Sequence, residues 1–528
     1  MESIQTTKLL NLSLKSNTIF TNLLVLAFLF FGLIGILNHE MWLDELQSWM
    51  IARDSSSISD LFNNLRYEGH PALWHVCLYF ISRFIRNPIA MQLFHLLLAT
   101  AVIYIFTKFS PFTELQKFLF AFGYFPFYEY NIISRNYSLG VLLIFLFCRF
   151  FPHRNQSYIL LSIILSLLAN TNVYGWIIAI CLAVTLLFEK IIDRSINRLF
   201  FTRRWDLIIS IIIFIVSIAI ALFQIIPPSD RGYKGDSEEV FTQSSLPLIN
   251  VGRLALTLTT IWTSYIPIPN LFEYKFWGTN ILTEGPAILK ICALLVSLRL
   301  LYFSIAIFIQ KPVALFLYLS GTFSILLFSY AKYFGSLRHH GHLFILFVAC
   351  IWISNYYTTD NFSRRFKALT KLFRYQKHYL TIILLIHVFV GFFAFSMDLS
   401  KPFSASKEVA SFIESHSLND TLIVSRDFAG APVAALLDKK IYYLDSDNFG
   451  SFIVWNKIRD NVNFQEIQDK INNLITPKDL NALLILSYEF APDNKRPDLK
   501  ISELSKFSKS IVFYEDYHLY LIRKKPLQ

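Results

Sequence analysis

Long apolar runs fill the first three quarters of this 528-residue chain, and they constrain its fold more than any other feature. A helix needs about 20 apolar residues, at 1.5 Å each, to cross roughly 30 Å of hydrocarbon. We predict eleven crossings, at residues 19–38, 88–107, 116–132, 136–151, 156–171, 173–189, 206–227, 286–309, 312–331, 341–357 and 378–397. The chain is therefore expected to be a polytopic α-helical membrane protein.

The charged residues divide the chain into two parts. Residues 1–400 carry 31 Lys and Arg against 20 Asp and Glu, whereas residues 401–528 carry 17 of each, so the whole net charge of +11 lies in the first part. The overall content of 54% hydrophobic and 16% charged residues excludes a soluble multidomain enzyme and a disordered chain. We predict a membrane module over 1–399 and a polar domain over 400–528. Because the excess positive charge belongs to membrane loops, no nucleic-acid partner is expected.

Basic residues predict the orientation, because short cytoplasmic loops carry the excess of Lys and Arg. The clusters are Arg149 with Arg154, then Lys190, Arg194, Arg198, Arg203 and Arg204, then Arg364, Arg365, Lys367, Lys371, Arg374 and Lys377. With these clusters and the N-terminus cytoplasmic, the non-cytoplasmic segments are 39–87, 132–136, 171–174, 228–285, 332–340 and the tail from residue 400. The five cysteines lie singly in apolar runs, so neither a disulfide framework nor a CxxC metal site is expected.

Two segments need a separate interpretation. Residues 71–86 are apolar enough to cross, but an in-plane amphipathic helix on the outer surface agrees better with the orientation downstream; Arg83 and Arg86 favour the crossing. Within the second large external loop, 228–285, the apolar stretch 254–268 is expected to lie along the membrane.

The polar tail has the pattern of a small α/β domain. Short buried strands are predicted at 421–425, 440–444, 482–487, 510–514 and 518–522, and helices at 405–416, 429–438, 463–474 and 501–508. The tail contains no GxGxxG motif and no P-loop, so nucleotide binding has no support there.

The first external loop holds the most informative motif, MWLDELQSW, with the adjacent carboxylates Asp44 and Glu45 shortly after the first span. Ionisable groups at this depth are costly and usually functional. The alternative is that Asp44 caps the following helix and Glu45 is solvated. Glu68 and His70 add a carboxylate and an imidazole to the same loop, although His70 also suits a helix cap.

Two shorter external turns supply further candidates. In SRNY, Arg135 starts a span at a point where its planar guanidinium suits a phosphate, or where it simply extends towards the interface. Tyr137 beside it also suits an aromatic belt. In NTNVYG, Asn172 and Tyr174 are candidates for a sugar pocket or parts of an ordinary turn.

The late external segment AKYFGSLRHHGH is basic against the positive-inside tendency. Its five candidate residues are Lys332, Arg338, His339, His340 and His342. A lipid phosphate is the ligand that we favour, with a solvated loop and a metal site as alternatives. The spacing HHxH at a helix start is no recognised zinc pattern.

Together these motifs resemble the GT-C superfamily of integral-membrane glycosyltransferases, and most closely the protein O-mannosyltransferase and lipid A aminoarabinose transferase branch. The resemblance rests on WLDE, EGHPALWH, SRNY, NVYG and RHHGH, in the order of the family, over roughly residues 17–345. Ala72 stands where the family usually has a second Pro after its His-Pro or Lys-Pro element.

The resemblance implies transfer of a sugar from a polyprenyl-phosphate donor to a lipid, glycan or protein acceptor on the non-cytoplasmic face, with inversion at the anomeric carbon. Asp44 is then the base and Glu45 orients it or the acceptor. The donor phosphate would be bound by Arg135, Lys332, Arg338 and His339 or His340, and the substrate also by Glu68, His70, Tyr137, Asn172 and Tyr174. A divalent metal, Mg²⁺ or Mn²⁺, at the carboxylates stays open.

Two other classes compete with this hypothesis. A transporter or lipid flippase also has many spans, but here the carboxylates gather at one face and no mid-span charges suggest an ion relay. A membrane scaffold that presents the polar domain would leave Asp44 and the basic segment without a shared cavity. We expect an integral protein of a bacterial inner membrane, with a cytoplasmic N-terminus and an extracytoplasmic C-terminal domain.

Overall fold

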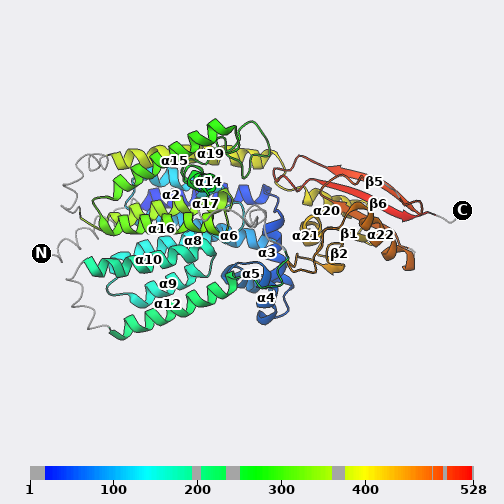
Figure 1. The fold of residues 1–528 in the computed structure, drawn as a ribbon, viewed down its shortest axis with the longest axis horizontal. Helices are drawn as coiled ribbons and strands as arrows, with labels where there is room; N and C mark the ends of the chain where they lie inside the picture. Colours follow the sequence, from blue (N-terminus) through cyan, green and yellow to red (C-terminus); the bar gives the residue numbers. More distant parts are fainter. Residues whose placement is uncertain are drawn as a thin grey trace.

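The computed structural model describes residues 18–192, 204–232, 250–358, 375–478, 480–491 and 496–525. In this part of the chain, a helical bundle and a small sheet domain lie end to end (Figure 1). The predicted basic clusters at 194–203 and 364–374 lie outside the described residues.

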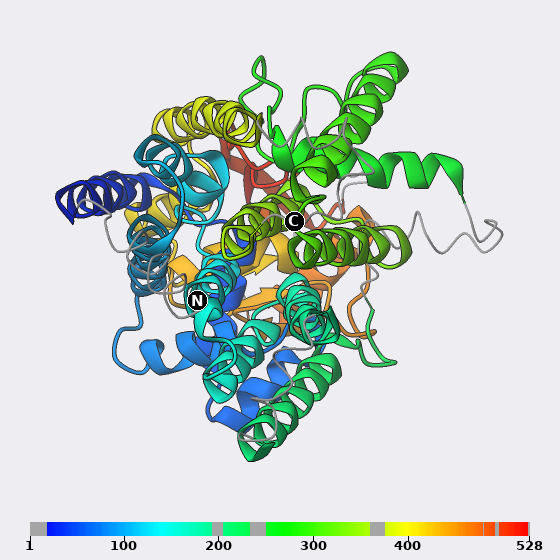
Figure 2. The same cartoon turned by 90° about the vertical axis from the view of Figure 1, so that its left-hand side faces the viewer.

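Eight described helices are long and apolar enough to cross a membrane. They are α2 (Thr18–Asn38), α6 (Ile89–Phe109), α10 (Val173–Ile192), α12 (Arg204–Ile225), α15 (Ala287–Phe308), α16 (Pro312–Ala331), α17 (Leu337–Ser354) and α19 (Gln376–Ser400). Seen from the end away from the sheet, they pack side by side as a bundle (Figure 2). Nearly all of α17 is buried, so this helix forms the centre of the bundle.

The other three predicted crossings fall on shorter elements. Residues 116–132 form α7 (Glu114–Ala121) and the π-helix η2 (Tyr124–Glu129) rather than one α-helix. Gly123 and Pro126 explain the break, because proline lacks the N–H that an α-helix interior needs. The remaining two are α8 (Tyr137–Phe150), extended by η3 (Phe151–His153), and α9 (Tyr158–Ala169).

The segment 39–87, predicted as the first external loop, is helical and packs against the sheet domain. It contains α3 (Leu43–Asp54), α4 (Ile58–Asn64), η1 (Leu65–Tyr67) and α5 (Leu73–Ser82). At 1.5 Å per residue, the ten residues of α5 extend only about 15 Å, half the thickness of the hydrocarbon core. The apolar stretch 254–268 forms most of α14 (Val251–Tyr265), which Figure 1 shows nearly end-on beside α17.

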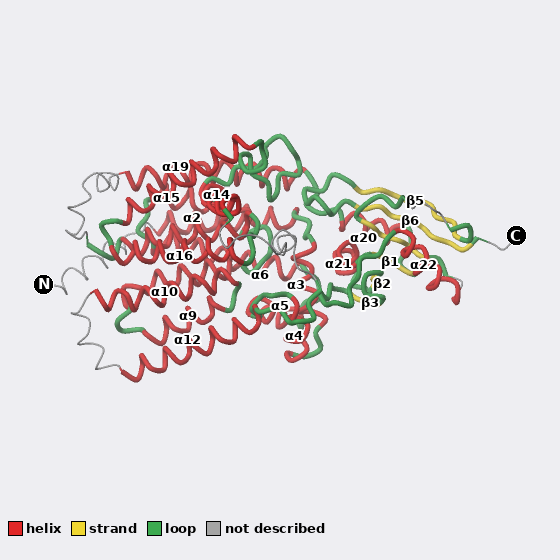
Figure 3. The backbone as a smooth tube through the Cα atoms, in the orientation of Figure 1, coloured by secondary structure: helices red, strands yellow, loops and turns green. Residues whose placement is uncertain are grey.

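The C-terminal domain has one six-stranded sheet in the order β3-β2-β1-β4-β6-β5 (Figure 3). Its elements are α20 (Ser406–Ser415), β1 (Leu422–Ser425), α21 (Asp427–Leu436), β2 (Ile441–Tyr443), β3 (Asn448–Gly450), α22 (Phe464–Ile475), η7 (Thr476–Lys478), β4 (Ala482–Leu486), β5 (Leu499–Phe507) and β6 (Tyr517–Lys524). Strand β1 is parallel to β2 and β4, whereas β3, β5 and β6 pair antiparallel. The prediction of a C-terminal domain with a small sheet is thus confirmed.

Two predicted elements of this domain are wrong. Residues 501–508 belong to the edge strand β5, where a bulge between Glu503 and Ser505 disturbs the alternation that normally marks a strand. Residues 510–514 form a turn instead of a strand. Ile511 and Val512 are buried, and their N–H groups donate to the carbonyls of Pro402 and Phe403 in the connection after α19 instead of to a neighbouring strand.

That turn, residues 508–516, fastens the sheet domain to the bundle. The Glu515 carboxylate accepts a 2.7 Å hydrogen bond from the N–H of Leu43, at the start of α3. A second contact joins Gln47 to Ile453 through two hydrogen bonds of 2.8 Å. The sheet domain therefore covers α3 and the adjacent end of the helical bundle.

Candidate functional site

Asp44 lies in the first turn of α3 and connects three parts of the chain. Its Oδ2 is 3.3 Å from Nη1 of Arg135 and 3.3 Å from Nη2 of Arg338. These residues are 91 and 294 positions away in sequence. The Asp44 side chain is 31% exposed, whereas those of Arg135 and Arg338 are 10% and 17% exposed. Two predicted donor-site residues thus meet the predicted base.

Each guanidinium also has a second contact that orients it. Arg135, in the turn before α8, donates from Nη1 to the main-chain oxygen of Asp44 at 2.6 Å. The guanidinium of Arg338 contacts two neighbouring indole rings, 5.1 Å from the ring centre of Trp42 and 5.2 Å from that of Trp277. Such cation–π contacts are strongest where water is excluded. Both positive groups are therefore oriented before any ligand arrives.

Glu45 is fully buried, and donors surround its carboxylate. Oε1 accepts from the N–H of Ser134 at 2.6 Å, and Oε2 accepts from the N–H of Trp42 at 3.2 Å. Oε2 is also 3.0 Å from Nε2 of His39. Glu45 thereby ties the start of α3 to the turn that carries Arg135. Unlike the Asp44 side chain, it has no exposure to solvent.

His39 completes a buried triad, with its Nδ1 2.8 Å from Oδ2 of Asp398 on α19. Burial disfavours the imidazolium, but the carboxylates of Asp398 and Glu45 outweigh this effect and raise the pKa of His39 to about 10. His39 is therefore charged at neutral pH and holds two carboxylates together. The sequence analysis missed both His39 and Asp398; the one local signal was a histidine six residues before Glu45.

Glu68 and His70 lie at the edge of the same cluster. Oε1 of Glu68 accepts from Gln47 at 2.9 Å. Burial raises the pKa of the Glu68 carboxyl to about 7, despite that hydrogen bond and the nearby Arg135. Burial, and then the charge of Arg135, lower the pKa of His70 to about 4. At neutral pH His70 is a neutral imidazole and Glu68 exchanges its proton readily.

An aromatic wall extends from Arg338 into the bundle. The ring of Tyr174 stacks on His342 at 4.9 Å and on His339 at 5.5 Å between centres, and Tyr137 meets both imidazoles edge-on. Gly335 passes close to this wall in the left-handed region, with φ of 80°, where a Cβ atom would come within 2.9 Å of the Tyr174 hydroxyl. Tyr137, Tyr174 and His339 thus lie together, as their prediction as site residues requires.

Three other predicted residues lie elsewhere or have structural partners. His340 has Nδ1 3.2 Å from the Thr263 hydroxyl on α14 and Nε2 3.0 Å from the carbonyl of Phe334 before α17, so both ring nitrogens have partners within the protein. Asn172 caps α10 by accepting from the N–H of Gly175. Lys332 is exposed at the end of α16, and within the described ranges its ammonium forms no ion pair.

The carboxylates do not suit a divalent metal. The one oxygen of Asp44 in this network is shared by two guanidinium groups, and both oxygens of Glu45 accept hydrogen bonds. Mg²⁺ and Mn²⁺ prefer sets of oxygen ligands without competing cations. Nowhere in the described ranges do three or more His, Cys, Asp or Glu side chains gather in a way that would hold a metal ion.

A scan against protein-family models finds no match for this chain, and a search of curated proteins finds no similar sequence.

Proposed function

We propose that this chain is a membrane glycosyltransferase of the GT-C type that transfers a sugar from a polyprenyl-phosphate donor to an acceptor. The observation that carries the proposal is the Asp44 carboxylate bridging Arg135 and Arg338, at 3.3 Å from each, beneath the sheet domain. A transferase of this kind needs a base for the acceptor hydroxyl and positive charge for the departing phosphate, and this cluster contains both.

The charge balance of the cluster favours an anionic ligand. Two guanidinium groups face one carboxylate, which leaves about one positive charge unneutralised in a site with little water. A planar guanidinium forms two parallel hydrogen bonds with phosphate oxygens, which a point charge such as lysine does not. A donor phosphate would therefore compete with Asp44 for both arginines.

This competition suggests how binding of the donor would activate Asp44 as a base. When the phosphate takes over Arg135 and Arg338, the Asp44 carboxylate loses its partners and becomes free to accept the proton of an acceptor hydroxyl. The hydroxyl oxygen then forms a bond to the anomeric carbon as the bond from that carbon to the phosphate oxygen breaks. Attack opposite to the leaving group inverts the configuration, and the arginines stabilise the released phosphate.

Glu45 and Glu68 take supporting roles in this proposal. Glu45 orients α3 and thus Asp44, as its buried hydrogen bonds suggest. Glu68, with its pKa near 7, would receive the proton from Asp44 after transfer. We propose the non-cytoplasmic face of a bacterial inner membrane as the location, because the site lies at the end of the bundle covered by the polar domain.

The decisive experiment compares Asp44→Asn with wild type in membranes supplied with polyprenyl-linked sugars. We expect transfer to fall by about 100-fold or more, the usual range for loss of a general base, while the protein inserts and folds normally. Asp60→Asn is the matched control, because Asp60 lies in the exposed start of α4.

Mass spectrometry of surface glycans from a deletion strain identifies the missing sugar and the polyprenyl-linked sugar that accumulates. Wild-type transfer by Asp44→Asn would contradict the base assignment. Accumulation of a transported solute without a change in any glycan would favour the transporter alternative.

A further inference from the structure

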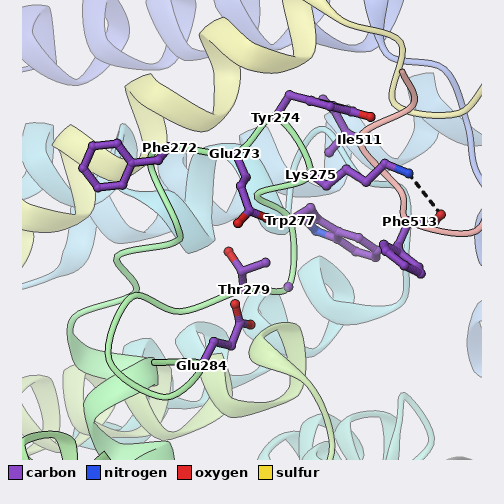
Figure 4. Close-up of a pocket in the computed structure, with 10 residues that line it drawn as sticks. Phe272, Glu273, Tyr274, Lys275, Trp277, Thr279, Glu284, Ile511 and Phe513 are labelled. Carbon is purple, nitrogen blue, oxygen red and sulfur yellow. Dashed lines mark hydrogen bonds between the residues drawn. The ribbon is translucent and has the colours of Figure 1, made fainter. Parts of the chain in front are cut away.

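A pocket lies next to the charge cluster of Asp44, Arg135 and Arg338, and the proposed transfer does not use it. This open pocket of about 540 Å³ lies between the external loop 266–286 and the turn 508–516 of the sheet domain (Figure 4). The loop supplies most of the wall, and Ile511 and Phe513 supply the rest. The pocket exists only because the sheet domain docks on the bundle.

Aromatic rings and carboxylates line this pocket together. Phe272 and Phe513 are 90% and 79% exposed, so both rings are accessible to a ligand. Glu273 and Glu284 also line the pocket and accept one hydrogen bond each from the loop, which leaves acceptor capacity for a ligand (Figure 4). Flat rings that pack on the C–H face of a sugar, beside carboxylates that accept from its hydroxyls, suit a carbohydrate.

The charges of the pocket oppose an anionic ligand. Its one cation, Lys275, is paired with Asp516 at 2.9 Å and also donates to the carbonyl of Phe513. Glu273 and Glu284 therefore make the open part of the pocket negative. The pocket would repel a phosphate or an anionic lipid headgroup, and the neighbouring Arg338 would attract it. A neutral saccharide would not be repelled by the pocket.

Trp277 joins the pocket to the charge cluster. Its ring lines the pocket, packs edge-on against Trp42 at 4.8 Å between centres, and lies 5.2 Å from the guanidinium carbon of Arg338. Its Nε1 donates to Glu129 at 3.1 Å, which holds the ring in place. A ligand that packs against Trp277 would therefore be separated from Arg338, which is proposed to bind the donor phosphate, only by the indole ring.

We propose that this pocket binds the carbohydrate portion of the acceptor, while Arg135 and Arg338 bind the donor phosphate. That the bound saccharide is an acceptor rests on the proposed function. Binding of a saccharide in the pocket can be tested whether or not the protein is a transferase. Of the acceptors that a transferase could use, the pocket selects one that already carries sugar.

The test measures binding of a panel of neutral hexose and N-acetylhexosamine oligosaccharides to the full-length protein in detergent, first on an immobilised array and then by calorimetry. We expect a saccharide of the panel to bind wild type, and Phe513→Ala and Glu273→Gln to weaken it by about tenfold or more. Phe449→Ala is the control, because Phe449 is a half-exposed ring on β3, outside the pocket.

Two outcomes overturn the proposal. One is that no oligosaccharide binds, or that the pocket variants bind as wild type does. The other is that Phe513→Trp, in phosphatidylcholine and phosphatidylglycerol nanodiscs, is quenched by brominated lipids, since the pocket would then lie among lipid headgroups. Asp44→Asn separates the two proposals, because it should bind the saccharide normally and lose only transfer.

Discussion

The bundle and the sheet domain each contain a cluster of aspartate and arginine, and the two clusters differ in balance. In the sheet domain, Arg426 pairs with Asp445 and Arg459 pairs with Asp427, through hydrogen bonds of 2.7 and 2.9 Å. At the end of the bundle, one carboxylate, Asp44, is shared by two arginines at 3.3 Å. Matched, short pairs hold a structure together, whereas a shared, longer contact leaves cationic groups ready for another anion.

The largest expected effect tests the unbalanced cluster. Arg338→Gln should lower transfer by about 100-fold or more, because a donor phosphate loses one of its two guanidinium partners. Folding should be affected far less, since Arg135 still pairs with Asp44. Transfer rates, together with the unfolding temperature, separate the two effects.

Arg459→Gln serves as the counterpart in the balanced cluster and should leave transfer within a few-fold of wild type. If Arg338→Gln and Arg459→Gln lower transfer equally, then the two clusters do not differ in function.

A second prediction concerns the balanced cluster. Asp445 is 2% exposed and accepts from Arg426 and from the N–H of Asp427. Asp445→Asn should destabilise the protein by about 3 kcal/mol, because it leaves the guanidinium of Arg426 partly buried without a counter-charge. Thermal unfolding of the full chain measures this loss. Asp447→Asn, at an exposed pair with Lys470, should cost under about 0.5 kcal/mol; a similar cost at both positions would contradict the comparison.

The third prediction concerns Glu515, at the junction of the two regions, a carboxylate without an arginine partner among the described residues. Burial raises the pKa of Glu515 to about 8, although Ser404 and the N–H of Leu43 donate to it. Since this pKa lies above the usual value for glutamate, Glu515 contributes full stability below about pH 4.5, and the contribution is lost as pH rises through about 8.

Glu515→Gln should therefore remove a pH dependence of up to about 1.4 kcal/mol per pH unit over this window. Unfolding curves between pH 5 and 8 check the difference in slope. Equal slopes for wild type and variant would show that Glu515 is not protonated in the folded state.

Several elements were predictable because their signals are local. Hydropathy predicts the eight long apolar helices of the described residues, and short apolar runs predict β1, β2, β4 and β6. The failures also have local causes. The bulge in β5 gives the strand a spacing close to that of a helix, and the apolar residues of the turn 508–516 are buried by docking on the bundle instead of by sheet pairing.

The candidate site was predictable in its chemistry but not in its partners. Asp44, Arg135 and Arg338 stand out as charged residues beside apolar runs. His39 and Glu515 do not stand out, because a histidine next to a span and a glutamate in a polar domain are ordinary in sequence. Their importance comes from Asp398 and Leu43, which are 359 and 472 positions away.

Hydropathy and charge are properties of single residues and their neighbours, so they are sufficient to establish a membrane module, a polar domain and a short set of candidate residues. Which of these residues meet depends on how the helices pack. A hydrogen bond or ion pair needs atoms within about 3 Å, a condition that spacing along the chain does not control. The bridge from Asp44 to two arginines and the triad at His39 arise only when the helices of the bundle pack together. The pocket beside Trp277 also needs the turn 508–516 of the sheet domain.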